Sequence, residues 1–464
     1  MTDGGSAHAP KSVPSANVSA SGSGPNIRTV TRVAFLGGLG SYFEYFDFFI
    51  ALLATSIAWP IVFFTGLPPA AGVALSLFSY ALTFFTRPVG AYVFGHFGDR
   101  LGRKRVLFMT LLLMGIGSLC ITLLPGASAW GIAAPILLSI IRLVQGFGLG
   151  GEAGGAATWI LEVAAKSKHR GFWTSWVQFG SPAGLASSAI LTSSLLAFQG
   201  HAVFVDWGWR IPFLIGGVAA VIGGFLRYRL AESPIFEKVA SSHKVEKYPA
   251  SQVLKKQWKK ILLIANVNYP ETLGTSVQVV PFSVVYMVQL HMNPAFASGA
   301  SVYLGLGAMI GTILVGVLCD YVGRKIFFIL SCVVGVAIAY PFYLILGTAN
   351  EAYIILLMFV WGFGVYLQNA VLPAFYAESY ETRWRYSGAS LSQQIGLLFS
   401  GIVIGIVLPA VLATSKGIYA NIWPSVAAIT IITSLISLIA SLFLKETKNV
   451  VVDDTTIRTE DLEA

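Results

Sequence analysis

The chain has 464 residues, of which 55% are hydrophobic and only 11% are charged. Soluble proteins carry about 25% charged residues, so this composition excludes an ordinary soluble protein and indicates that much of the surface faces lipid. The formal net charge of +9 does not indicate nucleic-acid binding, because most of the Lys and Arg residues fall in the tails and in alternate turns between apolar runs, as the positive-inside rule expects.

Apolar runs recur along the chain, each long enough to cross about 30 Å of hydrocarbon as a helix. The predicted spans are 30–58, 71–96, 105–124, 131–163, 171–197 and 209–229, followed by 259–289, 296–319, 326–347, 352–377, 387–414 and 420–444. We therefore predict an all-α integral membrane protein with twelve transmembrane helices in two pseudo-symmetric six-helix bundles. The bundles occupy 28–230 and 257–446, with a cytosolic linker at 231–256 and cytosolic tails at 1–27 and 447–464.

A short charged turn occurs once in each half. Gly95, Asp99, Gly102, Arg103 and Lys104 of the first copy recur as Gly316, Asp320, Gly323, Arg324 and Lys325 in the second. A duplicated half with charged turns between spans is typical of secondary transporters built from parallel repeats.

Acids and bases recur around both turns, at Glu162 and Arg170 in the first half and at Glu378 and Arg385 in the second. We predict two ion-pair networks that hold one state of the carrier closed at its cytosolic side. The alternative is that these charges only set topology, but topology does not require acids. The predicted gate residues are Asp99, Arg100, Arg103, Glu162, Arg170, Asp320, Arg324, Glu378 and Arg385.

Five ionisable residues stand out inside the predicted spans: Glu44, Asp47, Arg87, Arg142 and Glu152. Each costs at least about 2.5 kcal/mol on insertion scales and therefore needs a partner or a function. Glu44 and Asp47 share one helix face, and Arg87 is the expected cation for both. We predict that Asp47, then Glu44, then Glu152 carry the coupling proton, with both arginines in or near the cavity. One alternative is that Glu44, Asp47 and Arg87 form a static cluster that orients the first two helices. For Glu152, the alternative is a role in packing through a hydrogen bond.

A set of amides and aromatic residues falls at similar depth, much of it in the second half, where Pro270 interrupts a span. Buried amides need partners, which a substrate or a neighbouring helix can supply. The predicted substrate-binding residues are Arg142, Tyr45, Gln178, Tyr269, Glu271, Gln278, Trp361, Gln368, Asn369 and Gln394. Glu271 could instead be a second proton site.

The duplicated turn resembles the signature loop of the major facilitator superfamily, and the segments 142–146 and 180–184 resemble its helix-4 and helix-5 motifs. Tyr321 replaces an arginine in the second loop, which implies a weaker second network. The segments 44–49, 87–90, 150–156 and 232–234 resemble the metabolite:proton symporters, a group that carries shikimate, citrate, 2-oxoglutarate, proline and betaine. Sugar porters of the same superfamily are the second resemblance, since they share 232–234, the pattern of Arg142 and Glu162, and the ending Glu446-Thr447-Lys448.

The resemblance implies proton-coupled symport of a small organic acid or a zwitterion by alternating access, with a sugar porter as the alternative. A channel fits the repeats less well, and the sequence shows no constellation for an enzyme, no metal-ligand spacing and no nucleotide-binding loop. We expect no cofactor besides the coupling protons, and a monomer. The expected partners are the bilayer and an organic anion. The expected location is the plasma membrane, or the inner membrane of a Gram-negative cell, with both termini cytoplasmic.

Overall fold

A computed structural model describes residues 27–229, 248–274, 281–414, 422–450 and 452. Within these residues all regular elements are helices, and nine helical segments are long and apolar enough to cross a membrane. Each of the twelve predicted spans overlaps at least one helix of the described residues, and several spans are divided into shorter helices. The predicted fold class is therefore confirmed.

The N-terminal bundle contains six long helical segments, five of which are among the nine that could cross a membrane. They are α1 (Ile27–Ile57), α3 (Pro69–Leu101), α4 (Arg103–Leu123), α6 (Ala133–Leu149) with α7 (Glu152–Val163), α8 (Arg170–Val203) and α9 (Arg210–Tyr228), with short elements α2 (Trp59–Val62), α5 (Ala127–Trp130) and η1 (Phe204–Gly208) between them. The single span predicted over 131–163 is two helices. The break falls at Gly150, where a Cβ would lie only 2.3 Å from the Arg87 carbonyl oxygen of the neighbouring α3.

The C-terminal bundle repeats this plan with more interruptions. Its elements are α11 (Pro249–Ala265), α12 (Tyr269–Leu273), α13 (Ser283–Gln289), α14 (Pro294–Val322), α15 (Lys325–Leu346), α16 (Glu351–Val365), α17 (Leu372–Glu378), η3 (Thr382–Trp384), α18 (Arg385–Ile402), η4 (Val403–Val407), α19 (Leu408–Thr414) and α20 (Trp423–Leu442). The first span breaks after Ala265, next to Pro270, which lacks an N–H for the helix ladder. The helix α11 begins at Pro249, so its first turns lie in the segment predicted as linker.

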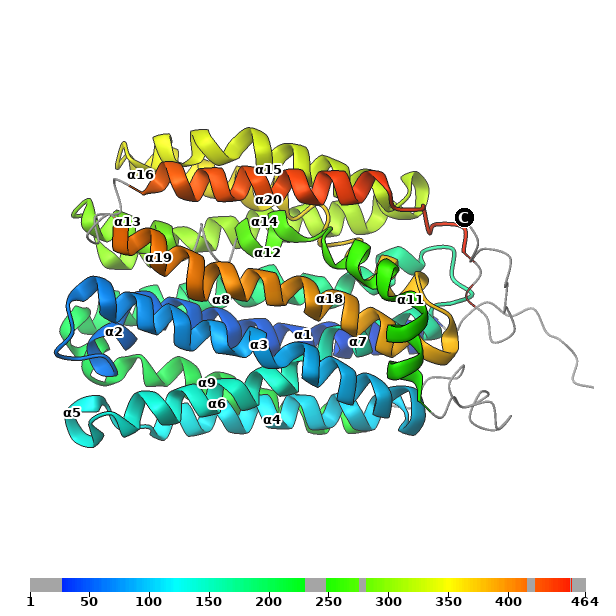
Figure 1. Ribbon diagram of the computed structural model, residues 1–464, viewed down its shortest axis with the longest axis horizontal. Coiled ribbons are helices and arrows are strands. Elements are labelled where there is room, and N and C mark those ends of the chain that lie inside the picture. The colour runs from blue at the N-terminus through cyan, green and yellow to red at the C-terminus, as the bar shows by residue number, and fades with distance from the viewer. Residues whose placement is uncertain (1–26, 230–247, 275–280, 415–421, 451, 453–464) are drawn as a thin grey trace, which may run out of the picture.

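The two bundles lie side by side, with α8 packed on α14 and α3 packed on α18 between them (Figure 1). The turns at Gly102 and Gly323 lie at one end of the bundle, together with residues 446–448 near the marked C-terminus. We call this the motif end. The opposite end, which carries α2, α5 and α13, is called the far end.

Helices within each bundle touch through glycines. A Cβ on Gly90 of α3 would lie 1.9 Å from the Phe147 carbonyl oxygen of α6, and a Cβ on Gly362 of α16 would lie 2.0 Å from the Leu304 carbonyl oxygen of α14. Lipid tails are as apolar as Leu, so close backbone packing, rather than exclusion of water, holds such helices together. The pair α3–α6 in the first half and the equivalent pair α14–α16 in the second both pack closely at a glycine.

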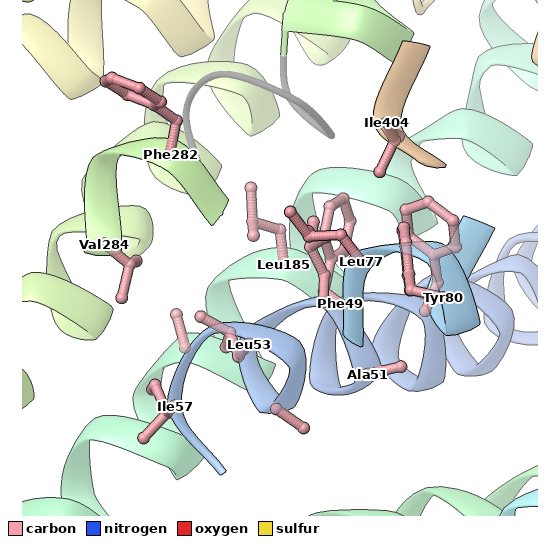
Figure 2. Packing of buried hydrophobic residues seen from close by; sticks show 14 of the residues in the cluster. Phe49, Ala51, Leu53, Ile57, Leu77, Tyr80, Leu185, Phe282, Val284 and Ile404 are labelled. Atoms are coloured by element: carbon pink, nitrogen blue, oxygen red, sulfur yellow. The ribbon is translucent and has the colours of Figure 1, made fainter. Parts of the chain in front are cut away.

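An apolar layer joins the bundles toward the far end (Figure 2). Figure 2 labels its members Phe49, Ala51, Leu53 and Ile57 of α1, Leu77 and Tyr80 of α3, Leu185 of α8, Phe282 and Val284 at α13, and Ile404 of η4. Beyond it, a cavity of about 390 Å³ opens between α1–α3 and α13, lined by residues such as Ile57, Pro60 and Val288. The two halves are therefore separated by a cavity at the far end.

Candidate functional site

Asp47 on α1 faces the interior of the N-terminal bundle and lies beside Arg142 of α6. The distance from Asp47 Oδ2 to Arg142 Nη1 is 3.9 Å, and both side chains are buried. Ser118 Oγ of α4 donates to Asp47 Oδ1, and Gln145 Nε2 donates to Asp47 Oδ2 at 3.3 Å. Arg142 in turn donates to Gln145 Oε1 at 2.9 Å. The Asp47 carboxylate thus contacts the Arg142 guanidinium and accepts hydrogen bonds from Ser118 and Gln145, all of which are buried.

Glu44, one turn earlier on α1, faces a different arginine. Its Oε1 lies 4.0 Å from Arg87 Nη1 of α3, and its Oε2 has no hydrogen-bond partner among the described residues. The Arg87 guanidinium lies over the rings of Phe48 and Phe84, at 5.4 and 5.1 Å from their centroids. The expectation that Arg87 serves both acids is wrong for Asp47, because Asp47 points toward α4 and α6, where Arg142 is placed.

Glu152 begins α7 and pairs with Arg227 of α9, a residue that the sequence analysis did not single out. Thr110 Oγ1 donates to the other Glu152 oxygen at 2.7 Å. Arg227 also donates to the carbonyl oxygens of Leu36 and Gly37 on α1, at 3.1 and 2.6 Å. This contact ties α1, α4, α7 and α9 together. The signal in the sequence was an arginine inside the predicted span 209–229.

Amide side chains connect the two halves near the middle of the molecule. Gln178 Nε2 of α8 donates to Asn369 Oδ1 at 2.8 Å, and Asn369 Nδ2 donates back to the Gln178 carbonyl oxygen at 3.2 Å. Tyr45 of α1 donates its hydroxyl to Gln178 Oε1 at 3.3 Å. Three of the predicted substrate-binding residues therefore lie in one hydrogen-bonded group at the interface between the bundles.

A second polar group surrounds the interrupted helix of the C-terminal half. Asn268 Nδ2 donates to Glu271 Oε2 at 3.2 Å, and the Gln368 amide contacts the Asn268 amide at 2.9 Å. Tyr269 donates its hydroxyl to Asn266 at 3.0 Å. Both amide atoms of the fully buried Gln394 lack a partner among the described residues. Such an amide is satisfied when a ligand or water reaches it.

Two predicted binding residues remain. Trp361 of α16 is fully buried, and its ring lies against the backbone of Gly274, where a Cβ would be 2.9 Å from the indole Cζ2. Gln278 lies outside the described residues. Most of the predicted substrate-binding set thus falls into these two groups, while Arg142 lies beside Asp47 and Trp361 packs beside the end of α12.

Two ionic networks lie at the motif end, and each takes one arginine from the opposite half. In the first gate network, Arg103 lies 3.1 Å from Glu162 and 3.5 Å from Asp99, and Arg385 of α18 lies 3.3 Å from the same Glu162 oxygen. We define it by Asp99, Arg103, Glu162 and Arg385. Arg100 does not take part, since it is exposed and its guanidinium faces His96 at 3.5 Å.

The second gate network mirrors the first. Arg324 lies 3.1 Å from both Asp320 and Glu378, and Arg170 of the N-terminal half lies 2.7 Å from Glu378. We define it by Asp320, Arg324, Glu378 and Arg170. Tyr321 is exposed, outside this network. Ion pairs that cross between the halves hold them together at the motif end.

Each repeated aspartate also caps the first turn of a helix from the other half. Asp99 accepts from the Ser387 N–H at 3.0 Å and from the Tyr386 N–H at 3.3 Å, while Asp320 accepts from the N–H groups of Gly171 and Phe172 at 2.9 and 3.0 Å. Free N–H groups at a helix start attract negative charge. This explains why the loop needs an acid.

The segment after α20 completes the second gate network. Thr447 Oγ1 donates to Glu378 Oε2 at 2.6 Å, and Arg170 donates to the Lys448 carbonyl oxygen at 2.8 Å. Both residues fall in a predicted cytosolic tail, because an irregular segment without periodicity gives no sign of its contacts. The described residues contain no cluster of three or more His, Cys, Asp or Glu placed to hold a metal ion.

Comparisons with known proteins agree with this architecture. The family model described as Major Facilitator Superfamily matches residues 38–400. The inner membrane metabolite transport protein YhjE of Escherichia coli K12 is 35% identical over 85% of this chain and 90% of its own. The shikimate transporter of the same organism is 31% identical, over 90% of this chain and 95% of its own.

A proline/betaine transporter of Escherichia coli K12 is also similar, with 30% identity over 89% of this chain and 82% of its own. Among solved structures, the proton:xylose symporter XylE bound to 6-bromo-6-deoxy-D-glucose superposes with a TM-score of 0.68, at 18% identity, over 91% of this chain and 96% of that one. At that identity the likeness shows the fold alone. Together with the sequence matches, it establishes that the chain belongs to the Major Facilitator Superfamily and is a multi-pass membrane transporter of metabolites, not an enzyme.

Proposed function

We propose that this transporter takes up a small organic acid or a zwitterionic metabolite together with protons, by alternating access across the plasma membrane. The observation that carries the proposal is the pair of buried acids on α1, each at the outer limit of ion-pair distance from its own arginine. The proposed orientation places the motif end and both termini in the cytoplasm, in line with the basic residues of that side.

Proton coupling follows from the cost of burying charge. An ionised carboxylate in the span is stable only while its arginine stays close. A substrate carboxylate that attracts Arg142 or Arg87 leaves Asp47 or Glu44 without its counter-charge, and proton uptake then becomes favourable. Asp47 is the first candidate, since Ser118 and Gln145 position its carboxyl beside Arg142.

Similarity supports the substrate class. Relatives that are 30–31% identical are named as transporters of shikimate and of proline and betaine. These compounds carry a carboxylate, which fits two arginines buried among the spans of the N-terminal half. Sugar transport is the alternative, and it leaves both arginines without a substrate charge to bind.

The test is uptake into proteoliposomes under an imposed pH gradient. Substrates come from a thermal-shift screen of carboxylates, amino acids, betaines and sugars at two pH values, since a ligand that binds the folded protein raises its melting temperature. Asp47→Asn should abolish accumulation against a gradient but retain exchange, while Asp206→Asn, a matched change at an exposed position, should transport normally. Normal accumulation by Asp47→Asn would disprove the proton assignment, and stabilisation by sugars alone would favour the alternative.

A further inference from the structure

Glu271 differs from every other buried acid of the described chain. Seven carboxylates are buried there: Glu44, Asp47, Asp99, Glu152, Glu162, Glu271 and Glu378. Six of them have an arginine nitrogen within 4.0 Å. Glu271 is 5% exposed, and among the described residues its carboxyl forms no ion pair with an Arg, Lys or His. Its charge therefore has no compensating partner from the described part of the protein.

A series of polar contacts links Glu271 to the N-terminal half. The hydrogen-bond donor to its carboxyl is Asn268 at 3.2 Å, which comes from the same interrupted helix. The Asn268 amide contacts Gln368 at 2.9 Å, and the next residue, Asn369, accepts a hydrogen bond from Gln178 of the N-terminal half at 2.8 Å. The hydroxyl of Tyr45 also binds Gln178, which bridges to Asn369. Tyr45 directly follows Glu44, the partner of Arg87, so these contacts lead from an acid of one half to an arginine of the other.

Arg87 supplies the complementary charge. It contacts Glu44 only at 4.0 Å, and its Nε has no partner among the described residues although the side chain is buried. A buried carboxylate without a cation and a loosely paired arginine are both costly in a low-dielectric interior. A ligand with opposite charges at its two ends relieves both costs.

We infer that the substrate is a small zwitterion whose cationic nitrogen binds Glu271 and whose carboxylate binds Arg87. This inference rests on the proposed function and narrows its substrate class. A dicarboxylate places a second negative charge beside Glu271, and a sugar leaves Glu271 without a cation. The zwitterion also touches both halves at once, so its binding responds to their relative position, as alternating access requires.

The experiment compares ligands of equal shape with and without the cationic nitrogen. Glycine betaine is paired with 3,3-dimethylbutanoate, and L-proline with cyclopentanecarboxylate. Binding to the purified full-length protein is measured at pH 7 by titration and by thermal shift, without a pH gradient. The variants are Glu271→Gln, which keeps the size and removes the charge, and Glu351→Gln, a matched change at an exposed position.

We expect at least one zwitterion to bind the unmodified protein at least tenfold more tightly than its carbon analogue. Glu271→Gln should raise the Kd of that zwitterion about tenfold or more and abolish the preference, while Glu351→Gln should change neither, since a charged hydrogen bond is worth at least a factor of ten. If Glu271→Gln fails to fold, the inference is still tested by the relative affinities of the unmodified protein for each zwitterion and its carbon analogue.

Three results would overturn the inference: equal affinity for the carbon analogues, an unchanged preference in Glu271→Gln, or the absence of binding by any zwitterion of the panel. A Glu271→Gln protein that binds zwitterions normally but fails to accumulate them would make Glu271 a second proton site instead. Because binding is measured without a gradient, these results are independent of the uptake test for proton coupling.

Discussion

Arg170 begins a helix of the N-terminal half, yet its Nε donates to Glu378 of the C-terminal half at 2.7 Å. The repeat supplies the mirror contact, in which Arg385 of the C-terminal half lies 3.3 Å from Glu162 of the N-terminal half. Each gate network therefore contains one arginine from its own loop and one from the other bundle. The motif end cannot open without breaking both exchanged contacts.

Loss of the Arg170 contact should open the motif end, and the chain contains its own reporter. Cys319 is fully buried and lies where the start of α8 meets α14, since a Cβ on Gly171 would be 2.6 Å from its sulfur. In a background with Cys120→Ala and Cys332→Ala, Arg170→Ala should raise the rate of maleimide labelling of Cys319 about tenfold or more, because a charged hydrogen bond contributes about 1.5–3 kcal/mol.

Arg383→Ala is the matched control for this measurement. Arg383 pairs with Glu381 at the same end of the molecule, but both residues lie on one side of the gate and are partly exposed, at 34% and 22%. Its removal should leave labelling unchanged, as expected for a surface ion pair. Equal rates in Arg170→Ala and the unmodified protein would show that the exchanged arginine does not hold the gate closed.

The sequence identified the gate residues because a duplicated loop repeats its acids and bases at matching positions. It also implied two separate networks, one for each half. It could not show that Arg170 and Arg385 exchange partners, because this depends on how the bundles face each other. Arg100 was included on pattern alone, and its side chain points away to His96.

For the buried charges too, residue spacing predicted which residues share a helix face but not which partners they contact. A spacing of three placed Glu44 and Asp47 on one side of α1, but the two side chains diverge enough to meet different helices. Arg142 of α6 contacts Asp47, although the two residues lie far apart in the sequence. No local sequence pattern predicts such a contact. Arg227 was overlooked, since it lies in the last turn of its span and resembles a topology signal.

Arg227 should be required for stability rather than for transport chemistry. Its removal in Arg227→Met leaves the Glu152 carboxylate buried without a cation and should lower the free energy of unfolding by about 3–5 kcal/mol. Combining it with Glu152→Gln removes that charge and keeps the hydrogen bond from Thr110, so part of the loss should return. Unfolding of the purified protein in detergent, measured for both single variants and the pair, checks this coupling.

Arg229→Met provides the comparison, because Arg229 is exposed two residues further along the chain. It should unfold like the unmodified protein. Proton-driven uptake by the double variant then decides the role of Glu152. Retained accumulation would remove Glu152 from the proton-coupling residues, whereas a stable double variant without accumulation would restore it.

Glu446 should make the stability of the motif end depend on pH. Its carboxylate accepts from the backbone N–H groups of Arg324 and Lys325, at the start of α15, and of Thr447 and Lys448. Burial raises the pKa of Glu446, but these four backbone hydrogen bonds lower it by more, so the pKa lies below its ordinary value of 4.5. A Cβ at Gly323 would lie 2.5 Å from this carboxylate, so the loop glycine leaves room for it.

A group with a lowered pKa in the folded state contributes stability that is fully present above its unfolded pKa and is lost as the pH falls through the folded value. Glu446→Gln should therefore lower the melting temperature by about 1–3 °C at pH 7, and this gap should shrink below pH 4.5, the ordinary pKa of the side chain. Glu381→Gln, which removes only the partner of Arg383, should show no such gap. A gap of constant size from pH 7 to pH 4 would mean that the ionised form of Glu446 is not what anchors the start of α15.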